Sequence, residues 1–358
     1  MDNTLYAFFG VGAGGANVEL NAIAAAGLAS VVALVLFSYA AEALRLRPTP
    51  PDKLPWGPGI SIKYANVAGV KVRYIKAGSG PDMVLLHTLR TQLDIFQKVI
   101  PALAEHFTVY AYDYPGHGWS DIPQADYAPE DFYQWTAAFL DALGIAQASV
   151  VGISIGGTIA LVLAGRRNPR IARAISINPY DYPPDGGIRK SSLLARLILG
   201  PSGIPILGAT LMRLRNRFVS DRIMEGGVAS ADALPPELIK ELYVVGERRG
   251  HYQAFLSLLA HERRWAEARN EYPHIRIPTL LVYGERDWAP RAQRDRSHGL
   301  ISGTAMQTVS GGGHFLSLDR PQELAGLIVK FVTSTPAHNP SAAKETTSDT
   351  ASSTPSSG

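Results

Sequence analysis

Cysteine is absent from this chain of 358 residues. Without thiols the protein can form neither a disulfide nor a metal site built from thiolate ligands. Charged residues are also sparse, at 18%, and no dense block of lysine and arginine with interleaved aromatic residues occurs. The net charge of +3 therefore does not indicate nucleic acid as a partner. Hydrophobic residues make up 46%, which is enough for one large domain of about 250–300 residues with extensions.

A long stretch near the N-terminus lacks charge altogether, from Leu20 to Ala41. As a helix it would span roughly 30 Å, the thickness of a bilayer core, and this predicts a single transmembrane anchor. An export signal normally begins with a basic segment, and no lysine or arginine precedes this stretch. An export signal and an interfacial helix are the alternatives. Arg45 and Arg47 follow the stretch, so the positive-inside rule predicts a cytoplasmic domain.

The middle of the chain alternates between expected strands and helices. The apolar runs DMVLLH (82–87) and FTVYAYDY (107–114) indicate strands buried on both faces. Helices are expected over 95–106 and 129–144. This alternation predicts an α/β fold, a mostly parallel sheet flanked by helices. A long block without a convincing strand predicts a helical insertion that caps the carboxyl ends of the strands. The predicted segments are an N-terminal segment (1–19), a transmembrane anchor (20–43), a proline-rich linker (44–59), an α/β core (60–181 and 278–334), a helical cap (182–277) and a disordered tail (335–358).

A serine lies between glycines where one expected strand becomes a helix, in the stretch VVGISIGGTIAL. A tight turn there would expose Ser154, and glycine at positions 152 and 156 would remove side chains that clash with the turn. The serine would also lie at a helix N-terminus, where free N–H groups favour a developing negative charge. Ser154 is therefore the candidate nucleophile.

A nucleophilic serine needs a base and an acid that orients the base. Asp287 follows the expected strand PTLLVYGE, and His314 follows three glycines after the last expected strand. Two carboxylates compete with Asp287 for the role of acid. Glu285 lies at the end of the strand, and Asp181 follows another strand. The order Ser154, Asp287, His314 is the preferred assignment.

This order resembles that of the α/β-hydrolase family, in particular its capped serine members, which include carboxylesterases, lipases, lactonases and carbon–carbon bond hydrolases. The loops DYPGHGWSD, GERDWAP and GGGHF match the family's pattern. The resemblance implies an oxyanion hole formed by the N–H groups of Leu89 and Ile155. Where relatives commonly have His-Gly, this chain has His87 and Thr88. Epoxide hydrolases and haloalkane dehalogenases share the fold but use aspartate in place of Ser154.

Several further side chains are candidates for substrate binding. Arg90 follows the oxyanion loop and would suit a carboxylate or enolate group, or it could pair with a local acid such as Asp94. Tyr180, Tyr182 and Trp288 follow other expected strands. The histidines of two further regions are expected in other roles. His117 is expected to be structural, whereas His251 and His261 are expected at the cap surface or the pocket.

These residues predict a serine esterase that forms an acyl-enzyme through Ser154, His314 and Asp287 and needs no metal or organic cofactor. The expected partners are the membrane and a small ester or lipid-like substrate with an apolar acyl or alkyl group, because the cap is rich in large apolar residues. A carbon–carbon bond hydrolase or lactonase is the first alternative. A ligand receptor with negligible turnover is the second. The natural substrate and the oligomeric state stay open.

Overall fold

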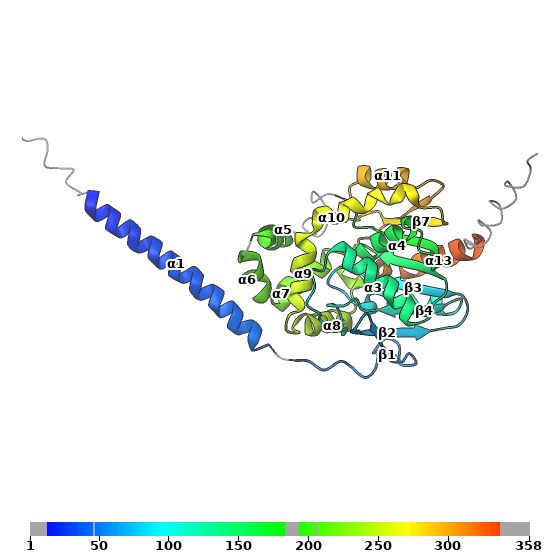
Figure 1. The fold of residues 1–358 in the computed structure, drawn as a ribbon, viewed down its shortest axis with the longest axis horizontal. Helices are drawn as coiled ribbons and strands as arrows, with labels where there is room; N and C mark the ends of the chain where they lie inside the picture. The colour runs from blue at the N-terminus through cyan, green and yellow to red at the C-terminus, as the bar shows by residue number, and fades with distance from the viewer. Residues whose placement is uncertain (1–12, 46, 183–192, 205, 337–358) are drawn as a thin grey trace, which may run out of the picture.

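A computed structural model of the chain describes residues 13–45, 47–182, 193–204 and 206–336. The expected tail, from residue 337 on, and most of the expected N-terminal segment lie outside the described residues. Within the described part, a globular body is joined to one long helix, α1 (Ala13–Ala43), that projects away from it (Figure 1).

One eight-stranded sheet forms the centre of the body, in the order β1-β2-β4-β3-β5-β6-β7-β8. The first two strands form the expected antiparallel hairpin, and β2 also pairs with β4 in antiparallel fashion. All other neighbouring pairs are parallel, which confirms the predicted α/β fold. The strands are β1 (Ile62–Val67), β2 (Val70–Ala77), β3 (Asp82–Leu86), β4 (Thr108–Tyr112), β5 (Ala148–Ile153), β6 (Ile171–Ile177), β7 (Thr279–Gly284) and β8 (Ala305–Val309).

Helices cover both faces of the sheet and enclose two large apolar clusters. One cluster contains side chains of α3 (Pro129–Ala142) and α4 (Ile155–Gly165). The other contains side chains of α2 (Ile100–Ala104) and α13 (Pro321–Ser334). The helix expected over 95–106 is wrong in extent. A short 3-10 helix, η1 (Leu93–Phe96), precedes α2, and the α-helix begins only at Ile100 because Pro101 has no N–H with which to continue a helix from the preceding turn.

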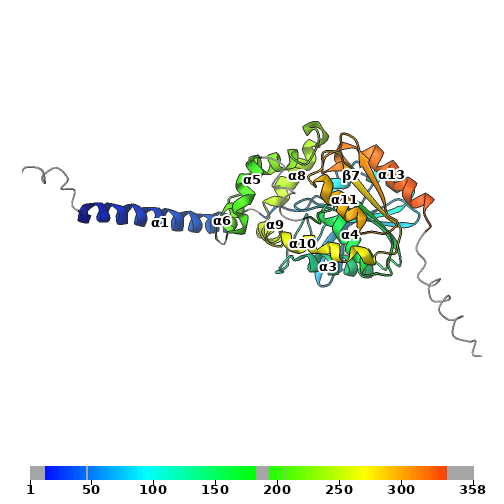
Figure 2. The same ribbon diagram turned by 90° about the horizontal axis from the view of Figure 1, so that it is seen from above.

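The expected cap contains helices joined by turns, and no strand, in its described residues. Its longer helices are α5 (Leu193–Leu199), α6 (Leu207–Arg213), α7 (Arg217–Glu225), α8 (Pro236–Gly246), α9 (His251–Ala260) and α10 (Glu262–Ala266). A third apolar cluster, the cap cluster, lies inside it and is formed by Leu199, Met212, Ile223, Tyr252, Phe255 and Leu259. The chain returns from the cap to the sheet at β7, before α11 (Arg291–Gly299) and α12 (Leu316–Asp319). Figure 2 shows α5, α6 and α9 on the side of the body that is nearest to α1.

The helix α1 is long and apolar enough to cross a membrane. Its residues Asn21–Ala43 have a mean hydropathy of 2.2, and almost all of them are exposed. A signal sequence meets the same test of length and composition. The described residues of the proline-rich segment that follows form no helix or strand, and they pack onto the body.

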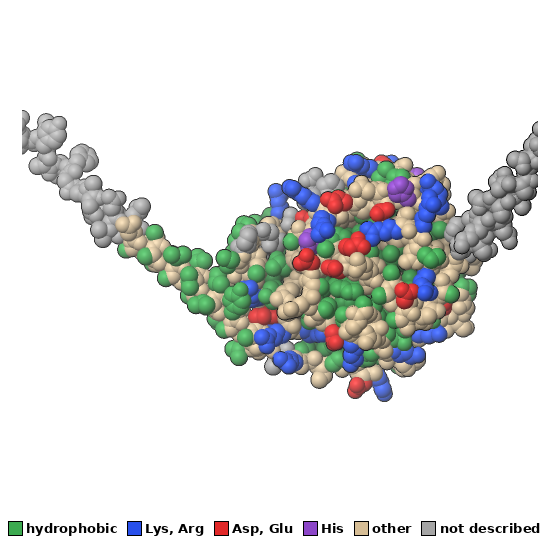
Figure 3. Space-filling model, in the orientation of Figure 1, with side chains coloured by type: hydrophobic (Ala, Val, Ile, Leu, Met, Phe, Trp, Pro, Cys, Tyr) green, Lys and Arg blue, Asp and Glu red, His purple; other side chains and the backbone are tan. Residues whose placement is uncertain are grey.

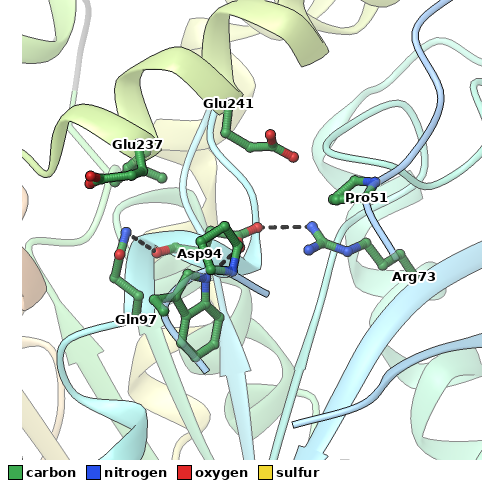
Figure 4. A pocket seen from close by; sticks show the side chains of 9 residues that line it. Pro51, Arg73, Asp94, Gln97, Glu237 and Glu241 are labelled. Carbon is green, nitrogen blue, oxygen red and sulfur yellow. Dashed lines mark hydrogen bonds and ion pairs between the residues drawn. The ribbon is translucent and has the colours of Figure 1, made fainter. Parts of the chain in front are cut away.

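The contact between this segment and the body is built around a buried ion pair. Leu54 is buried, and the Trp56 Nε1–H donates to Asp94 Oδ1 at 2.6 Å. The other carboxylate oxygen, Asp94 Oδ2, lies 2.8 Å from Arg73 Nη1 (Figure 4). Arg73 Nη1 also lies 3.3 Å from Asp113 Oδ2. These groups border a cavity of about 270 Å³ that reaches α8. The segment 44–59 is therefore fastened to the body at Leu54 and Trp56.

Candidate active site

Ser154 lies on a strained turn between β5 and α4. Its φ of 58° and ψ of −118° fall in a region that residues with a side chain rarely adopt. Three glycines make the turn possible. A β-carbon at Gly152 would clash with the backbone of Gly156, and one at Gly156 would clash with the carbonyl of Leu86. One at Gly157 would lie 2.5 Å from Ser176 Oγ. The strand, the turn and the helix therefore have the arrangement of a nucleophile elbow.

His314 and Asp287 are brought together from two different loops. His314 Nδ1 lies 2.6 Å from Asp287 Oδ1, and both side chains are buried. Asp287 Oδ2 accepts a hydrogen bond from the Ala289 amide at 3.0 Å, which fixes the carboxylate. Among the described residues, His314 Nε2 has no hydrogen-bond partner. The ring is thus oriented by the acid at one nitrogen and free to take a proton at the other.

The two competing carboxylates have other partners. Asp181 contacts Arg269 at 3.2 Å and accepts hydrogen bonds from Tyr272 Oη at 2.9 Å and Ser297 Oγ at 2.8 Å. Glu285 accepts from the Gly311 amide at 2.8 Å and from Ser310 Oγ. Neither carboxylate is a partner of His314 in the described structure. Asp287 therefore has the position that the acid of a triad requires.

The two expected oxyanion donors follow the ends of neighbouring strands. Ile155 begins α4, so its N–H has no carbonyl partner within the helix. Leu89 follows β3 in a loop that His87 holds in place. His87 Nε2 accepts from the Tyr114 amide at 3.0 Å, and its Nδ1 lies 2.8 Å from the Thr88 carbonyl. Because Nε2 accepts, the His87 ring is neutral and Nδ1 carries the proton.

The aromatic candidates differ in their surroundings. Trp288 stacks on His314, with ring centroids 3.9 Å apart and planes 13° apart. Its Nε1–H donates to the Gly226 carbonyl of the cap at 3.0 Å. Tyr180 and Tyr182 are buried in the core cluster that contains α3 and α4, with ring centroids 5.3 Å apart. Trp288 is thus the aromatic candidate that contacts the histidine.

Arg90 faces the cap rather than Asp94, whose carboxylate pairs with Arg73. It has a φ of 56°, and its guanidinium lies 5.1 Å from the centre of the Phe255 ring. Burial, followed by repulsion from Arg215, lowers the pKa of Arg90 to about 10. At neutral pH it is still protonated. Arg90 therefore places a positive charge between the oxyanion loop and the cap cluster.

A buried asparagine that the sequence pattern did not reveal joins three loops of the site. Asn178 follows β6 with a φ of 47°. Its side-chain amide donates to the carbonyls of Gly313 and His314 at 3.1 and 2.9 Å, and its Oδ1 accepts from the Gly284 amide at 2.9 Å. The sequence feature that could have pointed to Asn178 is a polar residue directly after a buried strand. Asn178 positions the histidine loop against the ends of β6 and β7.

Three buried histidines lie side by side behind the oxyanion loop. The ring centroids of His87 and His117 are 5.6 Å apart, and those of His117 and His251 are 6.3 Å apart. His251 is 4% exposed, so it is not a surface residue of the cap. Burial lowers the pKa of His117 to about 4 and lowers the pKa of His87 and His251 well below the usual range. All three are neutral at physiological pH and support the loop and the cap.

Comparison with known proteins places this chain in a family. The profile of the alpha/beta hydrolase fold matches residues 81–321. Haloalkane dehalogenase 2 of Mycobacterium tuberculosis is 25% identical over 73% of this chain and 91% of its own length. A carboxylesterase of Bacillus subtilis is 25% identical over 75% of this chain and 86% of its own length. The crystal structure of a bacterial membrane phospholipase A superposes with a TM-score of 0.65, at 25% identity, over 89% of this chain and 97% of its own.

Proposed function

Because the chain belongs to the α/β-hydrolase family, we propose that it is a serine hydrolase that cleaves carboxylic esters with an apolar acyl or alkyl group. The observation that carries this proposal is the 2.6 Å contact between His314 Nδ1 and Asp287 Oδ1, with the opposite ring nitrogen free among the described residues. The strained turn at Ser154 supports it, since such a turn projects the hydroxyl of a nucleophile above the end of the sheet.

In the proposed reaction, His314 Nε2 takes the proton of the Ser154 hydroxyl as Oγ attacks the acyl carbon. Asp287 holds the ring and stabilises its charged form. The N–H groups of Leu89 and Ile155 bind the negative oxygen of the tetrahedral intermediate. That intermediate expels the alcohol, which receives the proton from His314. A water molecule then attacks the acyl-enzyme with His314 again as the base, and the acid leaves.

The preference for an apolar substrate is drawn from the cap cluster. Leu89 and Trp288 both pack against this cluster, so its apolar side chains adjoin the residues of the site. An apolar acyl group buried there would gain about 0.8 kcal/mol for each CH2. The carboxylesterase and the membrane phospholipase A are consistent with ester cleavage. The similarity to a haloalkane dehalogenase supports the fold alone, because Ser154 stands where the dehalogenases carry aspartate.

The test is hydrolysis of p-nitrophenyl esters from acetyl to palmitoyl by the full-length protein in detergent. Ser154→Ala should abolish turnover and labelling by a serine-directed phosphonate, and Ser310→Ala, which changes an exposed serine, should leave both intact. A folded wild type with neither turnover nor labelling would refute the proposal. Labelling without turnover of any ester would favour the low-turnover receptor.

Arg90 favours a second candidate, a lactonase or a carbon–carbon bond hydrolase with the same three residues. Its positive charge beside the oxyanion loop would hold a carboxylate or enolate of the substrate. If so, Arg90→Gln should raise the KM for an acid-bearing lactone or vinylogous diketone, with little effect on p-nitrophenyl acetate. Equal effects on acidic and neutral substrates would rule this candidate out.

We further propose that α1 anchors the enzyme as a single-pass membrane protein with its catalytic domain in the cytoplasm. The apolar length of Asn21–Ala43 and the arginines that follow support this arrangement. Protease added to intact spheroplasts should leave the domain uncut, and protease added after lysis should cut it. Digestion in intact spheroplasts would place the domain on the other side.

A further inference from the structure

The outer surface of the cap carries a group of exposed large apolar side chains, here called the cap patch. Its members are Leu193 and Leu197 of α5, Ile204, Ile206 and Leu207 around the start of α6, and Phe218 of α7. They are between 39% and 73% exposed. In the described part of the chain, the other exposed large apolar residues are on α1 or are Leu44 and Tyr64. Such a concentration on one face marks an interaction surface.

The helices of the cap patch are apolar on their inner side as well. Leu199 of α5, Met212 of α6 and Ile223 of α7 belong to the cap cluster, which adjoins Leu89 and Trp288 at the site. These helices thus form a thin apolar layer between the outside of the molecule and the candidate active site. A helix that is apolar on both sides needs an apolar neighbour on each.

The cap patch is held beside the end of the apolar helix. One face of α1 packs against the cap through Ser38 and Glu42, which are both buried. Arg213, the last residue of α6, donates to Ser38 Oγ at 3.2 Å, and its guanidinium lies 3.7 Å from the centre of the Tyr39 ring. Arg215 Nη1 lies 2.7 Å from Glu42 Oε2.

This junction is fixed by several buried contacts rather than by a flexible tether. Glu42 Oε1 also accepts from the Gly250 amide at 2.8 Å, and Arg45 pairs with Glu42 at 3.0 Å and with Glu247. Such contacts define the orientation of the cap relative to α1. Both ribbon views place α6 beside the C-terminal end of α1, and Figure 3 shows hydrophobic side chains continuing from α1 onto the adjacent part of the body.

We propose that the cap patch is a lipid-binding surface that lies in the boundary between headgroups and acyl chains of the bilayer that α1 crosses. Ser38, which contacts α6, lies near the C-terminal end of the apolar stretch Asn21–Ala43. The helix α6 therefore lies at the depth where this stretch leaves the membrane. Two exposed arginines directly precede patch residues in the sequence, Arg196 before Leu197 and Arg217 before Phe218, and would supply positive charge for the headgroups. The next step rests on the proposed esterase function. The substrate class is then an amphiphilic ester, which leaves the same leaflet of the bilayer and reaches the site through the layer formed by α5, α6 and α7.

The absence of cysteine makes a direct test possible in the full-length protein. Leu197→Cys and Phe218→Cys would each carry an environment-sensitive fluorophore in proteoliposomes, with Lys330→Cys as control on the distant helix α13. We expect brominated lipid to quench the first two labels and aqueous iodide to quench the third. Quenching of all three by iodide alone would overturn the proposal. Shielding of residues 197 and 218 from both quenchers would also overturn it, because a protein such as a second copy would then cover the patch.

Enzyme kinetics provide a second, independent readout. The double variant Leu197→Glu, Phe218→Glu should cleave a vesicle-borne phospholipid several-fold more slowly than the wild type and cleave p-nitrophenyl acetate equally well. Tyr64→Glu, which changes an exposed apolar residue on β1, should alter neither rate. If the double variant and the wild type cleave the vesicle substrate at equal rates, the proposed passage of the substrate from the bilayer through α5–α7 is overturned. A wild type that cleaves no ester would refute the esterase function and leave the quenching result to decide the lipid contact.

Discussion

The indole of Trp288 stacks on the imidazole of His314, with ring centroids 3.9 Å apart and planes 13° apart. The same indole is tied to the cap through its hydrogen bond to the Gly226 carbonyl. Trp288 therefore connects the cap to the orientation of the proposed base. A change in the position of the cap would be transmitted to His314 through this contact.

Replacing Trp288 should slow the reaction without abolishing it. An aromatic pair contributes about 0.5–1.5 kcal/mol, so loss of that contact should lower kcat about 2- to 12-fold. Trp288→Ala should show this loss with p-nitrophenyl acetate, and Trp288→Phe should recover most of it because a ring is retained. An unchanged kcat in Trp288→Ala would mean that the stacking does not position His314.

Replacing Asn178 should affect both stability and activity. Asn178→Ala leaves the buried carbonyls of Gly313 and His314 without their donor, which should lower the free energy of unfolding by about 1–3 kcal/mol. Urea denaturation measures this loss, and kcat should fall in the same variant because the histidine loop loosens. Asn270→Ala, at an exposed position, is the matched control and should change neither quantity. Full stability in Asn178→Ala would contradict the positioning role.

Stability should decrease in mild acid because of the buried histidines. An unfolded histidine binds a proton near pH 6.5, whereas folded His117 stays neutral until about pH 4. Between these values the unfolded state binds more protons, so the free energy of unfolding falls as the pH falls. His117 alone should account for about 2 kcal/mol between pH 8 and pH 5.

Urea midpoints measured at intervals from pH 8 to pH 5 would test this dependence. His117→Gln should flatten it, since glutamine does not titrate. His298→Gln, which changes a partly exposed histidine on α11, should keep the slope of the wild type. A wild-type profile that is flat over this range would show that the three histidines are not held neutral by the fold.

The glycines of the elbow should tolerate no side chain. A β-carbon at Gly152 meets the backbone of Gly156, which cannot move without distorting the turn at Ser154. Gly152→Ala should therefore be strongly destabilised and inactive. Gly299→Ala, where nothing lies within 4 Å, should fold and react normally. Thermal unfolding of the two variants, followed by an ester assay, distinguishes these outcomes, and a stable, active Gly152→Ala would argue against the elbow.

The local pattern of residues was sufficient for the α/β fold, the elbow at Ser154, the helical nature of the cap and the presence of a long apolar helix near the N-terminus, although α1 begins at Ala13, ahead of the predicted anchor of 20–43. These features depend on properties that neighbouring residues reveal: apolar runs, glycine spacing and the absence of charge. The helix expected over 95–106 was wrong in extent because α2 begins at Ile100 with Pro101 in its first turn, and a proline has no N–H to continue a helix from residue 97. His251 was expected at the surface or the pocket of the cap, and it is buried against His117, a contact between distant residues that no local pattern reveals.

Other relationships were decided only by the tertiary structure, because they join residues far apart in the chain. The sequence by itself named Ser154, Asp287 and His314, but the choice of Asp287 over Asp181 depends on which carboxylate meets the histidine. Asn178 could be recognised only from the carbonyls around it. The contact of Glu42 with Arg215 sets the cap against α1 across 173 residues. A sequence pattern records which groups are available, and the folded chain determines which of them share the low-dielectric interior where their charges and hydrogen bonds act strongly.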